Sequence, residues 1–473
     1  GKGKGKLGKG DVIFDGDGDG RRGGGRGSGS AQMRSPSTAA RTGSEPSLGW
    51  GVQATPSTAE ALAPTETAKV AAKAAPAASP AGSARCACHL YWFRKALRTH
   101  DNPSLLQARD AAVAAGVPLL CIFVLDPWFV ASGRVGVNRL RFLREGLEAL
   151  DVSLRSTLGV PLLVLRGGEA AEALRGFWRR FGLEDGGGVV TWEACDEDYA
   201  KARDSAVRET AARCGVEARA LGGGHTLYPP EELLKLCPRR EPPLKYGDFM
   251  ELVEAAGPPP APRPTVAPLP APLLVAAHAL LVASDAAYPA RAVAAKTATA
   301  TATATSATLE VAALLRVPVS LAEMGCNAAE EEITTKADDG KAEDGGTGGG
   351  FRLVGGEVAA LERLQTVVSA RPEWVRAFDK PSSNPLLWRP GSTSMLSPYL
   401  KFGMLSCRTM HAALDAALGL DGGGDSPTIR QQSLHGQLYW REFFYLLHHA
   451  TPNFCRATSN PLCLQVGWRL PST

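Results

Sequence analysis

Residues 90–105 read LYWFRKALRTHDNPSL, an apolar run that changes abruptly into charged and amide side chains. The run has the aromatic content of a buried strand. Ligands of open α/β sheets bind beyond the carboxyl ends of the strands, so the polar residues that follow are candidates for a binding site. They are equally consistent with a capped helix start carrying salt-bridged basic side chains. The sequence favours neither interpretation of Arg94, Lys95, Arg98, Asp101 and Asn102.

Four further apolar runs follow, at residues 118–125, 160–165, 189–192 and, more weakly, 216–221. Helical patterns lie between them, and residues 138–155 repeat leucine at helical spacing, at Leu140, Leu143, Leu147 and Leu150. Strands that alternate with helices predict a parallel sheet covered on both faces. We therefore expect residues 88–235 to form one doubly wound α/β domain.

The rest of the chain divides into low-complexity and helical segments. Residues 1–87 are a Gly-, Arg- and Ala-rich tail that we expect to be disordered, and whose stretch 21–43 suits an organelle transit segment or a flexible basic tail. Residues 236–350 are expected to be a linker, with a low-complexity insertion at 265–350. Helical patterns at 358–368, 397–403, 405–418 and 434–449 predict that residues 351–473 begin an all-helical domain.

Composition excludes several classes of protein. The 52 basic and 48 acidic residues give a net charge of +4, without the strong basic footprint of many nucleic-acid-binding proteins. No run approaches the ~18 apolar residues of a membrane span. The ten cysteines include no Cys-x-x-Cys pair, and the eight histidines show no zinc-ligand spacing. We expect a soluble, intracellular protein with reduced thiols and no metal.

Two segments in the helical part carry candidate ligand-binding residues. In GSTSMLSPYLKFG at 391–403, Thr393, Ser394 and Ser397 precede a helix, where hydroxyls and free N–H groups bind phosphate or simply cap the helix. In HGQLYWREFFY at 435–445, Gln437, Trp440 and Arg441 share a helix face that suits a flat heteroaromatic ligand or a mixed core-and-surface helix. The residues alone favour the structural alternative in both segments.

Together these segments resemble the photolyase/cryptochrome family of flavoproteins, and most of all its animal-type branch, which includes the (6-4) DNA photolyases. The resemblance covers about residues 88–255 and 353–468. Its segments include WFRKALRTHDNPSLLQA at 92–108, GVNRLRFLREGLEALDVSL at 136–154, STSMLSPYLKFGMLSCR at 392–408, HGQLYWREFFY at 435–445 and NPLCLQVGW at 460–468.

The resemblance implies cofactors and site residues. The α/β domain of the family holds an antenna chromophore, a folate or a deazaflavin, and the helical domain holds FAD. By similarity, the residues around the FAD phosphates would be Lys380, Thr393, Ser394, Met395, Leu396 and Ser397. Gln437, Trp440 and Arg441 would line the flavin pocket, with Trp440 near an extruded lesion.

Three functions follow as alternatives. The first is a DNA photolyase, in which light-excited reduced flavin donates an electron to a pyrimidine dimer, most specifically a (6-4) photoproduct, in UV-damaged DNA. The second is a cryptochrome, a blue-light photoreceptor or circadian regulator that acts through signalling or clock proteins. The third is a flavin-free remnant in which only the α/β domain binds a ligand. The expected protein is a monomer in the nucleus or the chloroplast.

The sequence also departs from the family pattern. Family members continue well beyond the tryptophan that matches Trp468, whereas RLPST at 469–473 does not resume their text. We therefore expect a chain truncated within the FAD-binding domain, with catalytic residues that cannot be assigned and with enzyme activity left open. His448 and His449 match no histidine motif of the family and are expected at a helix C-terminus, where cations suit the helix dipole.

Overall fold

A computed structural model describes residues 88–130, 135–166, 168–287, 314–316, 320–326, 352–380, 392–420, 431–456 and 458–465. All of them belong to one compact unit, which runs from Ala78 to Thr473. The predicted tail at 1–87, with its transit-segment alternative, and Trp468 lie outside the described residues.

The described strands form one sheet in the order β5-β4-β1-β2-β3-β6. Strands β1 to β5 run parallel, and β6 pairs antiparallel with β3. The five predicted strands are confirmed, and the strongest apolar runs are those buried along their whole length. The bounds are β1 Cys88–Phe93, β2 Leu119–Val124, β3 Leu162–Leu165, β4 Gly188–Glu193, β5 Glu217–Leu221 and β6 Leu314–Arg316.

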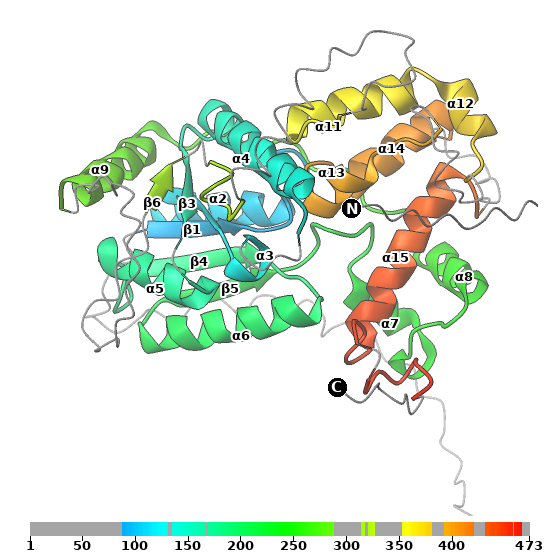
Figure 1. The fold of residues 1–473 in the computed structure, drawn as a ribbon, viewed down its shortest axis with the longest axis horizontal. Helices are drawn as coiled ribbons and strands as arrows, with labels where there is room; N and C mark the ends of the chain where they lie inside the picture. Colours follow the sequence, from blue (N-terminus) through cyan, green and yellow to red (C-terminus); the bar gives the residue numbers. More distant parts are fainter. Residues whose placement is uncertain are drawn as a thin grey trace, which may run out of the picture. The chain divides into compact units, whose positions relative to one another are not determined.

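Helices cover both faces of this sheet, as the alternating pattern predicts. Figure 1 shows α4 (Val137–Thr157) on one face and α5 (Ala170–Arg180) with α6 (Asp198–Arg213) on the other. The connection after β1 leads into α2 (Pro103–Ala115), and the one after β2 contains the short α3 (Pro127–Val130). The predicted α/β fold class is therefore confirmed.

The later part of the chain is helical, also as predicted. The predicted helix at 358–368 is α11 (Glu357–Leu364) followed by a π-helical turn, η2 (Gln365–Ser369), and then by α12 (Pro372–Ala377). The other three are α13 (Ser397–Phe402), α14 (Cys407–Leu418) and α15 (Leu434–Ala450). The hydroxyl groups of Ser406 and Ser433 cap α14 and α15 by accepting backbone N–H groups of the first turn.

The interval 236–350, expected to be a linker, contains regular structure. Its beginning overlaps α7 (Pro230–Leu236), which is followed by η1 (Pro238–Arg240), α8 (Tyr246–Ala256), α9 (Ala271–Ala287) and the strand β6. Helix α8 forms because Tyr246, Phe249 and Val253 bury one apolar face, with Tyr246 and Phe249 packed against Phe443 of α15. Among the described helices, none combines the length and the apolar composition that a membrane crossing requires.

The connection after β1 is bonded to the helical part through buried polar groups. The Asp101 carboxylate is fully buried and accepts from the Arg408 guanidinium at 3.0 Å, from Ser406 Oγ and from Arg263 N at 2.8 Å. Arg98, 1% exposed, donates to the carbonyl oxygens of Gly403 and Gly224 at 2.9 and 2.8 Å. Since an unpaired buried charge is costly, these bonds make the two parts depend on each other.

Gly403 allows the close approach at this junction. Its φ is +66°, and a Cβ atom there would come within 1.6 Å of the Lys95 carbonyl oxygen. Neither the backbone conformation nor the space at this position accepts a larger residue.

Replacing Arg408 with methionine should lower the free energy of unfolding by about 3–5 kcal/mol, because the Asp101 charge stays buried without its cation. Denaturant unfolding of the purified chain measures this. The matched control is Arg155→Met, which removes an ion pair with Asp151 from a side chain that is 53% exposed and should change the same quantity by less than about 1 kcal/mol. Equal effects of the two substitutions would show that the buried pair does not hold the parts together.

Candidate functional site

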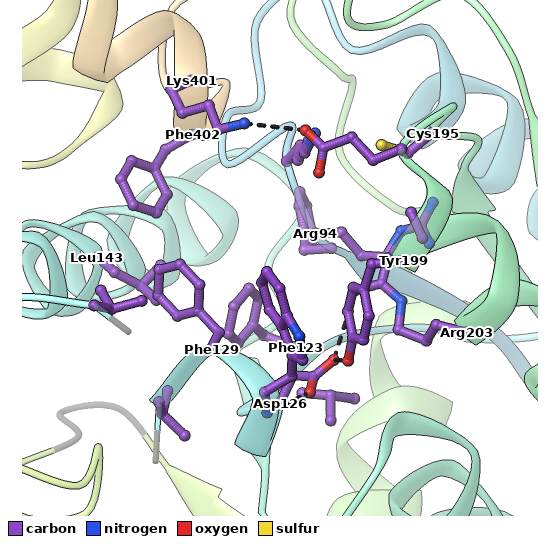
Figure 2. Close-up of a pocket in the computed structure, with 18 of the residues that line it drawn as sticks. Arg94, Phe123, Asp126, Phe129, Leu143, Cys195, Tyr199, Arg203, Lys401 and Phe402 are labelled. Carbon is purple, nitrogen blue, oxygen red and sulfur yellow. Dashed lines mark hydrogen bonds and ion pairs between the residues drawn. The ribbon is translucent and has the colours of Figure 1, made fainter. Parts of the chain in front are cut away.

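A cavity of about 410 Å³ opens at the carboxyl ends of β1, β2 and β4. The strand order reverses between β1 and β4, because the chain passes from β3 back across the sheet to β4. Open α/β sheets bind ligands at such a point. The side chains labelled in Figure 2 line the cavity: Arg94, Phe123, Asp126, Phe129, Leu143, Cys195, Tyr199, Arg203, Lys401 and Phe402.

Aromatic rings form two walls of the cavity. The ring of Trp128 stacks on that of Tyr199, with centroids 4.5 Å apart and planes at 18°. Figure 2 shows Phe129 and Phe402 on the side away from Tyr199, and these two rings meet edge to face at 6.2 Å. Trp128 is 45% exposed and therefore borders the opening. The walls suit a flat ring system, which gains both apolar burial and ring contacts.

The charged groups of the cavity are largely paired with one another. Tyr199 donates its hydroxyl hydrogen to Asp126 Oδ2 at 2.5 Å, and Arg94 donates to the Asp204 carboxylate and to the Glu193 carbonyl oxygen. Burial lowers the pKa of Arg203 from its ordinary value, with the nearby charge of Arg94 as a second cause. In the described part of the chain the buried Nε atoms of Arg94 and Arg203 make no hydrogen bond, and Arg203 Nε lies 3.7 Å from Asp204 Oδ1.

A lysine pair closes the cavity on the side of the helical part. Glu197 binds Lys95, which follows β1, and also Lys401 of α13, with Lys401 Nζ 3.0 Å from Oε1. Burial opposes the charged form of Glu197, but Lys95 and then Lys401 outweigh it and lower the pKa of this carboxyl to about 2. The cavity wall is therefore shared between the sheet and α13.

The structure separates the polar cluster after β1 into two groups. Arg94 and Lys95 line the cavity, as the binding-site interpretation predicts. Arg98 and Asp101 make buried bonds within the chain, and Asn102 caps α2 by accepting from Leu105 N at 3.0 Å. The capped-helix interpretation is thus confirmed for Asn102, while the binding-site interpretation of Arg94 and Lys95 stays a prediction.

Of the residues predicted to wrap phosphates, Thr393 to Leu396 form the loop before α13, and Ser397 is the first residue of the helix. Thr393 and Ser394 are half-buried, Leu396 is buried and Ser397 is exposed. Met395 has a φ of 54°, a left-handed conformation that turns the loop. Arg363 of α11 fixes it by donating from Nε to the Ser394 carbonyl oxygen at 2.7 Å, and Ser394 Oγ accepts from Leu396 N at 3.4 Å.

The predicted flavin-pocket residues lie on α15 and point to different partners. Gln437 donates to the Gln431 carbonyl oxygen at 2.9 Å, and the Trp440 ring stacks on Tyr246 of α8 at 4.1 Å. Arg441 donates to the His225 carbonyl oxygen at 2.6 Å and pairs with the buried Glu442. In the described part of the chain, none of these side-chain contacts reaches the loop 393–397.

Lys380 lies beside the start of α15. Its backbone N–H donates to the Gln432 carbonyl oxygen at 2.9 Å, and the residue is exposed. The structure therefore brings Lys380 close to the segment that leads into Gln437, but joins it by no described hydrogen bond or ion pair to Thr393 or Ser394.

His448 and His449 occupy the last turn of α15, which confirms their expected place at a helix C-terminus. A hydrogen bond with Asp196, at 2.7 Å, raises the pKa of His449. Burial lowers the pKa of His448, whose Nε2 lies 3.6 Å from Cys455 Sγ.

Sequence reasoning missed the cavity residues Asp126, Trp128, Tyr199 and Arg203. The signal was present, because Asp126 and Trp128 come directly after β2, and Tyr199 and Arg203 open the helix after β4. A ligand site at a parallel sheet draws residues from the ends of several strands, so the residues after β2 and β4 are candidates as much as those after β1.

Three comparisons with known proteins agree on one family. A family model described as DNA photolyase matches residues 89–268. Over 381 residues the chain is 32% identical to cryptochrome-1 of Spalax judaei, covering 80% of this chain and 54% of that protein. Over 405 residues it is 33% identical to the (6-4)DNA photolyase of Oryza sativa subsp. japonica, covering 83% and 61%.

The fold has a solved counterpart in the cryptochrome of Synechocystis sp. PCC6803, with a TM-score of 0.51 at 17% identity. The match covers 78% of this chain and 62% of that one. The chain thus spans between half and two thirds of the length of these relatives.

Replacing Glu197 with glutamine should reduce the loss of unfolding free energy that the wild type shows on acidification. The folded-state pKa of about 2 lies below the ~4.3 of an unfolded glutamate, so the pairing with Lys95 and Lys401 adds stability above pH ~4.3. That contribution is lost as the pH falls from there toward 2. Unfolding free energies measured across this interval should converge for the wild type and Glu197→Gln. A difference that stays constant with pH would contradict the assigned pairing.

Proposed function

The chain belongs to the family of DNA photolyases and cryptochromes, and we propose that it serves as a blue-light-dependent flavoprotein that repairs ultraviolet photoproducts in DNA, specifically (6-4) photoproducts. The observation that carries the proposal is a hydroxyl-bearing loop before α13 in a chain that is 33% identical to a (6-4)DNA photolyase. UV-damaged DNA is then the substrate, and the nucleus or the chloroplast is where this monomer would meet it.

The donor set of the loop 393–397 fits the phosphates of FAD. Thr393 and Ser394 offer half-buried hydroxyl groups, and the turn at Met395 leads into the helix start, where backbone N–H groups have no partner within the helix. Arg363 adds positive charge beside the Ser394 carbonyl oxygen. Hydroxyl, N–H and guanidinium donors around one loop are the chemistry that a pyrophosphate requires.

The aromatic and amide groups of α15 suit the ring end of the same cofactor. Trp440 is held flat against Tyr246, with planes at 14°, so its ring is fixed before any ligand binds. Gln437 supplies an amide three residues earlier on the helix. When bound, reduced FAD excited by blue light would supply an electron to the damaged pyrimidine pair. The task of these side chains would be to hold and orient cofactor and lesion.

The cavity at the strand ends suits an antenna chromophore, a folate or a deazaflavin. Its facing aromatic walls match a flat ring system, and the guanidinium groups of Arg94 and Arg203 in the lining bring positive charge that suits the oxygen and nitrogen acceptors of such a ring.

A cryptochrome function is the second candidate, since cryptochrome-1 of Spalax judaei is 32% identical to the chain over 381 residues. In that case the chain would act as a photoreceptor or circadian regulator through signalling or clock proteins. Both functions require FAD and concern the whole protein, of which this chain spans part.

Added FAD should bind the full chain, and replacing Thr393 with valine together with Ser394 with alanine should weaken binding roughly tenfold or more, because hydrogen bonds to a charged phosphate are lost. Equilibrium dialysis with flavin absorbance measures the affinity. The control is Ser156→Ala, an exposed hydroxyl that donates to the Ser153 carbonyl oxygen on α4. A chain that acquires no flavin absorbance would end the proposal of FAD binding for these residues.

Photorepair assays separate the two functions once flavin is bound. The flavin-loaded chain is reduced, illuminated with blue light and given DNA with either (6-4) or cyclobutane dimers. Light-dependent loss of the (6-4) product supports the photolyase proposal. Bound, light-reducible flavin without repair of either lesion favours the cryptochrome function instead.

Replacing Trp128 with alanine should weaken chromophore binding in the cavity about tenfold, since one stacked wall is lost. The probes are a tetrahydrofolate and a deazaflavin, titrated by fluorescence. Trp374→Ala, which removes a half-buried tryptophan of α12 that contacts Phe378, is the control and should bind as the wild type does. Unchanged affinity in Trp128→Ala would place the chromophore elsewhere.

A further inference from the structure

Two histidines and an aspartate converge where α14 meets α15. His411 and Asp415 are four residues apart on α14 and therefore share a helix face. His411 Nδ1 lies 2.9 Å from Asp415 Oδ2. From the first turn of α15, His435 Nε2 lies 2.9 Å from Asp415 Oδ1. One ligand atom from each residue can be chosen so that all three lie within 4.8 Å of one another.

The two imidazoles are buried, whereas the carboxylate is partly exposed. His435 and His411 are 3% and 9% exposed, whereas the side chain of Asp415 is 31% exposed. The two imidazole rings are nearly perpendicular, at 83°, with centroids 5.1 Å apart, so their nitrogens approach the carboxylate from different directions. The point between them is thus enclosed on the imidazole side and reachable from solvent on the carboxylate side.

Further contacts hold the imidazole rings in place. The second ring nitrogen of His411, Nε2, lies 3.0 Å from the Tyr439 hydroxyl on α15. Metal-binding histidines commonly use their other nitrogen in this way, which fixes the tautomer and the orientation of the ring. Ser433 caps α15 by accepting from Gly436 N at 3.0 Å, and so fixes the turn that carries His435. The three groups are therefore presented by two capped helices.

We propose that His411, Asp415 and His435 bind a divalent cation of the zinc class, with water completing the coordination. Two imidazole nitrogens and one carboxylate oxygen are a donor set typical of zinc, and three protein ligands leave a position open. In the bound form His411 carries its proton on Nε2, facing the Tyr439 oxygen, and directs the Nδ1 lone pair to the cation. The cation would tie the start of α15 to α14.

The carboxylate is available for this role. Its side chain is 31% exposed, and its two oxygens each lie 2.9 Å from one imidazole nitrogen. The sequence shows no zinc spacing because the ligands are split between positions 411–415 and 435. The site is separate from the loop and the cavity of the proposed function and does not depend on them.

The full chain, stripped of metal with a chelator, should bind one equivalent of Zn²⁺ at this site in a calorimetric titration. His435→Gln should weaken that binding roughly 100-fold or more, because one of three ligands is lost. The matched control is His448→Gln, which removes a histidine from a second group in the described part of the chain that could hold a metal, Asp198, His448 and Cys455. Binding that survives in His435→Gln but is lost in His448→Gln would overturn the assignment, as would no binding by the wild type.

Co²⁺ gives a second measurement that needs no variant. Bound to His411, Asp415 and His435, it should show d–d absorption without the charge-transfer band of a thiolate ligand. A thiolate band on the wild-type chain would point to Cys455 and contradict the proposal.

Discussion

The Asp101 carboxylate is the group on which the rest of the structure depends. It lies between β1 and α2 with a φ of 39°, is fully buried and accepts hydrogen bonds from two distant segments. Arg263 N comes from the interval expected to be a linker, and Ser406 and Arg408 come from the start of α14. A carboxylate this buried is tolerable only with all its partners in place. Sheet and helices must therefore be completed together, and the junction is rigid where the cavity begins.

This junction also links the two proposed ligand sites. Helix α13 is six residues long, so its ends are only about 9 Å apart. At its start is the loop with Thr393 and Ser394, and at its end Lys401 and Phe402 form part of the cavity wall. A single short helix thus carries groups for a phosphate at one end and for a flat chromophore at the other. Gly403 fixes its position against the chain after β1.

The sequence predicts the strands of the sheet, but not the buried contacts between the connection after β1 and the helical part. Strands β1 to β5 are found because buried parallel strands are continuous apolar runs, and α13 to α15 because their periodicity is regular. Helix α8 is missed because its sequence neighbours are rich in proline and charged residues, so its apolar residues do not stand out as a helical pattern. Their burial is evident only from the packing of α8 against α15. Thr393 and Gln437 stand out through motifs, whereas Trp128 and Arg203 are found only by examining the residues that follow β2 and β4. No local sequence pattern predicts the buried ion pair of Arg408, because its partner Asp101 is 307 residues away in the chain.

The two borders of the sheet are protected by different means. On one side β5 is short, half-exposed and carries Glu217 and Arg219, charges that discourage another strand from adding there. On the other side the backbone of β3 pairs with β6, a strand that comes from the low-complexity insertion at 265–350. That stretch therefore pairs with a row of backbone donors and acceptors on β3 that would otherwise be open. Removing β6 by shortening this stretch would leave the edge of β3 unpaired. Exposed backbone groups on such an edge promote pairing with another chain and hence self-association.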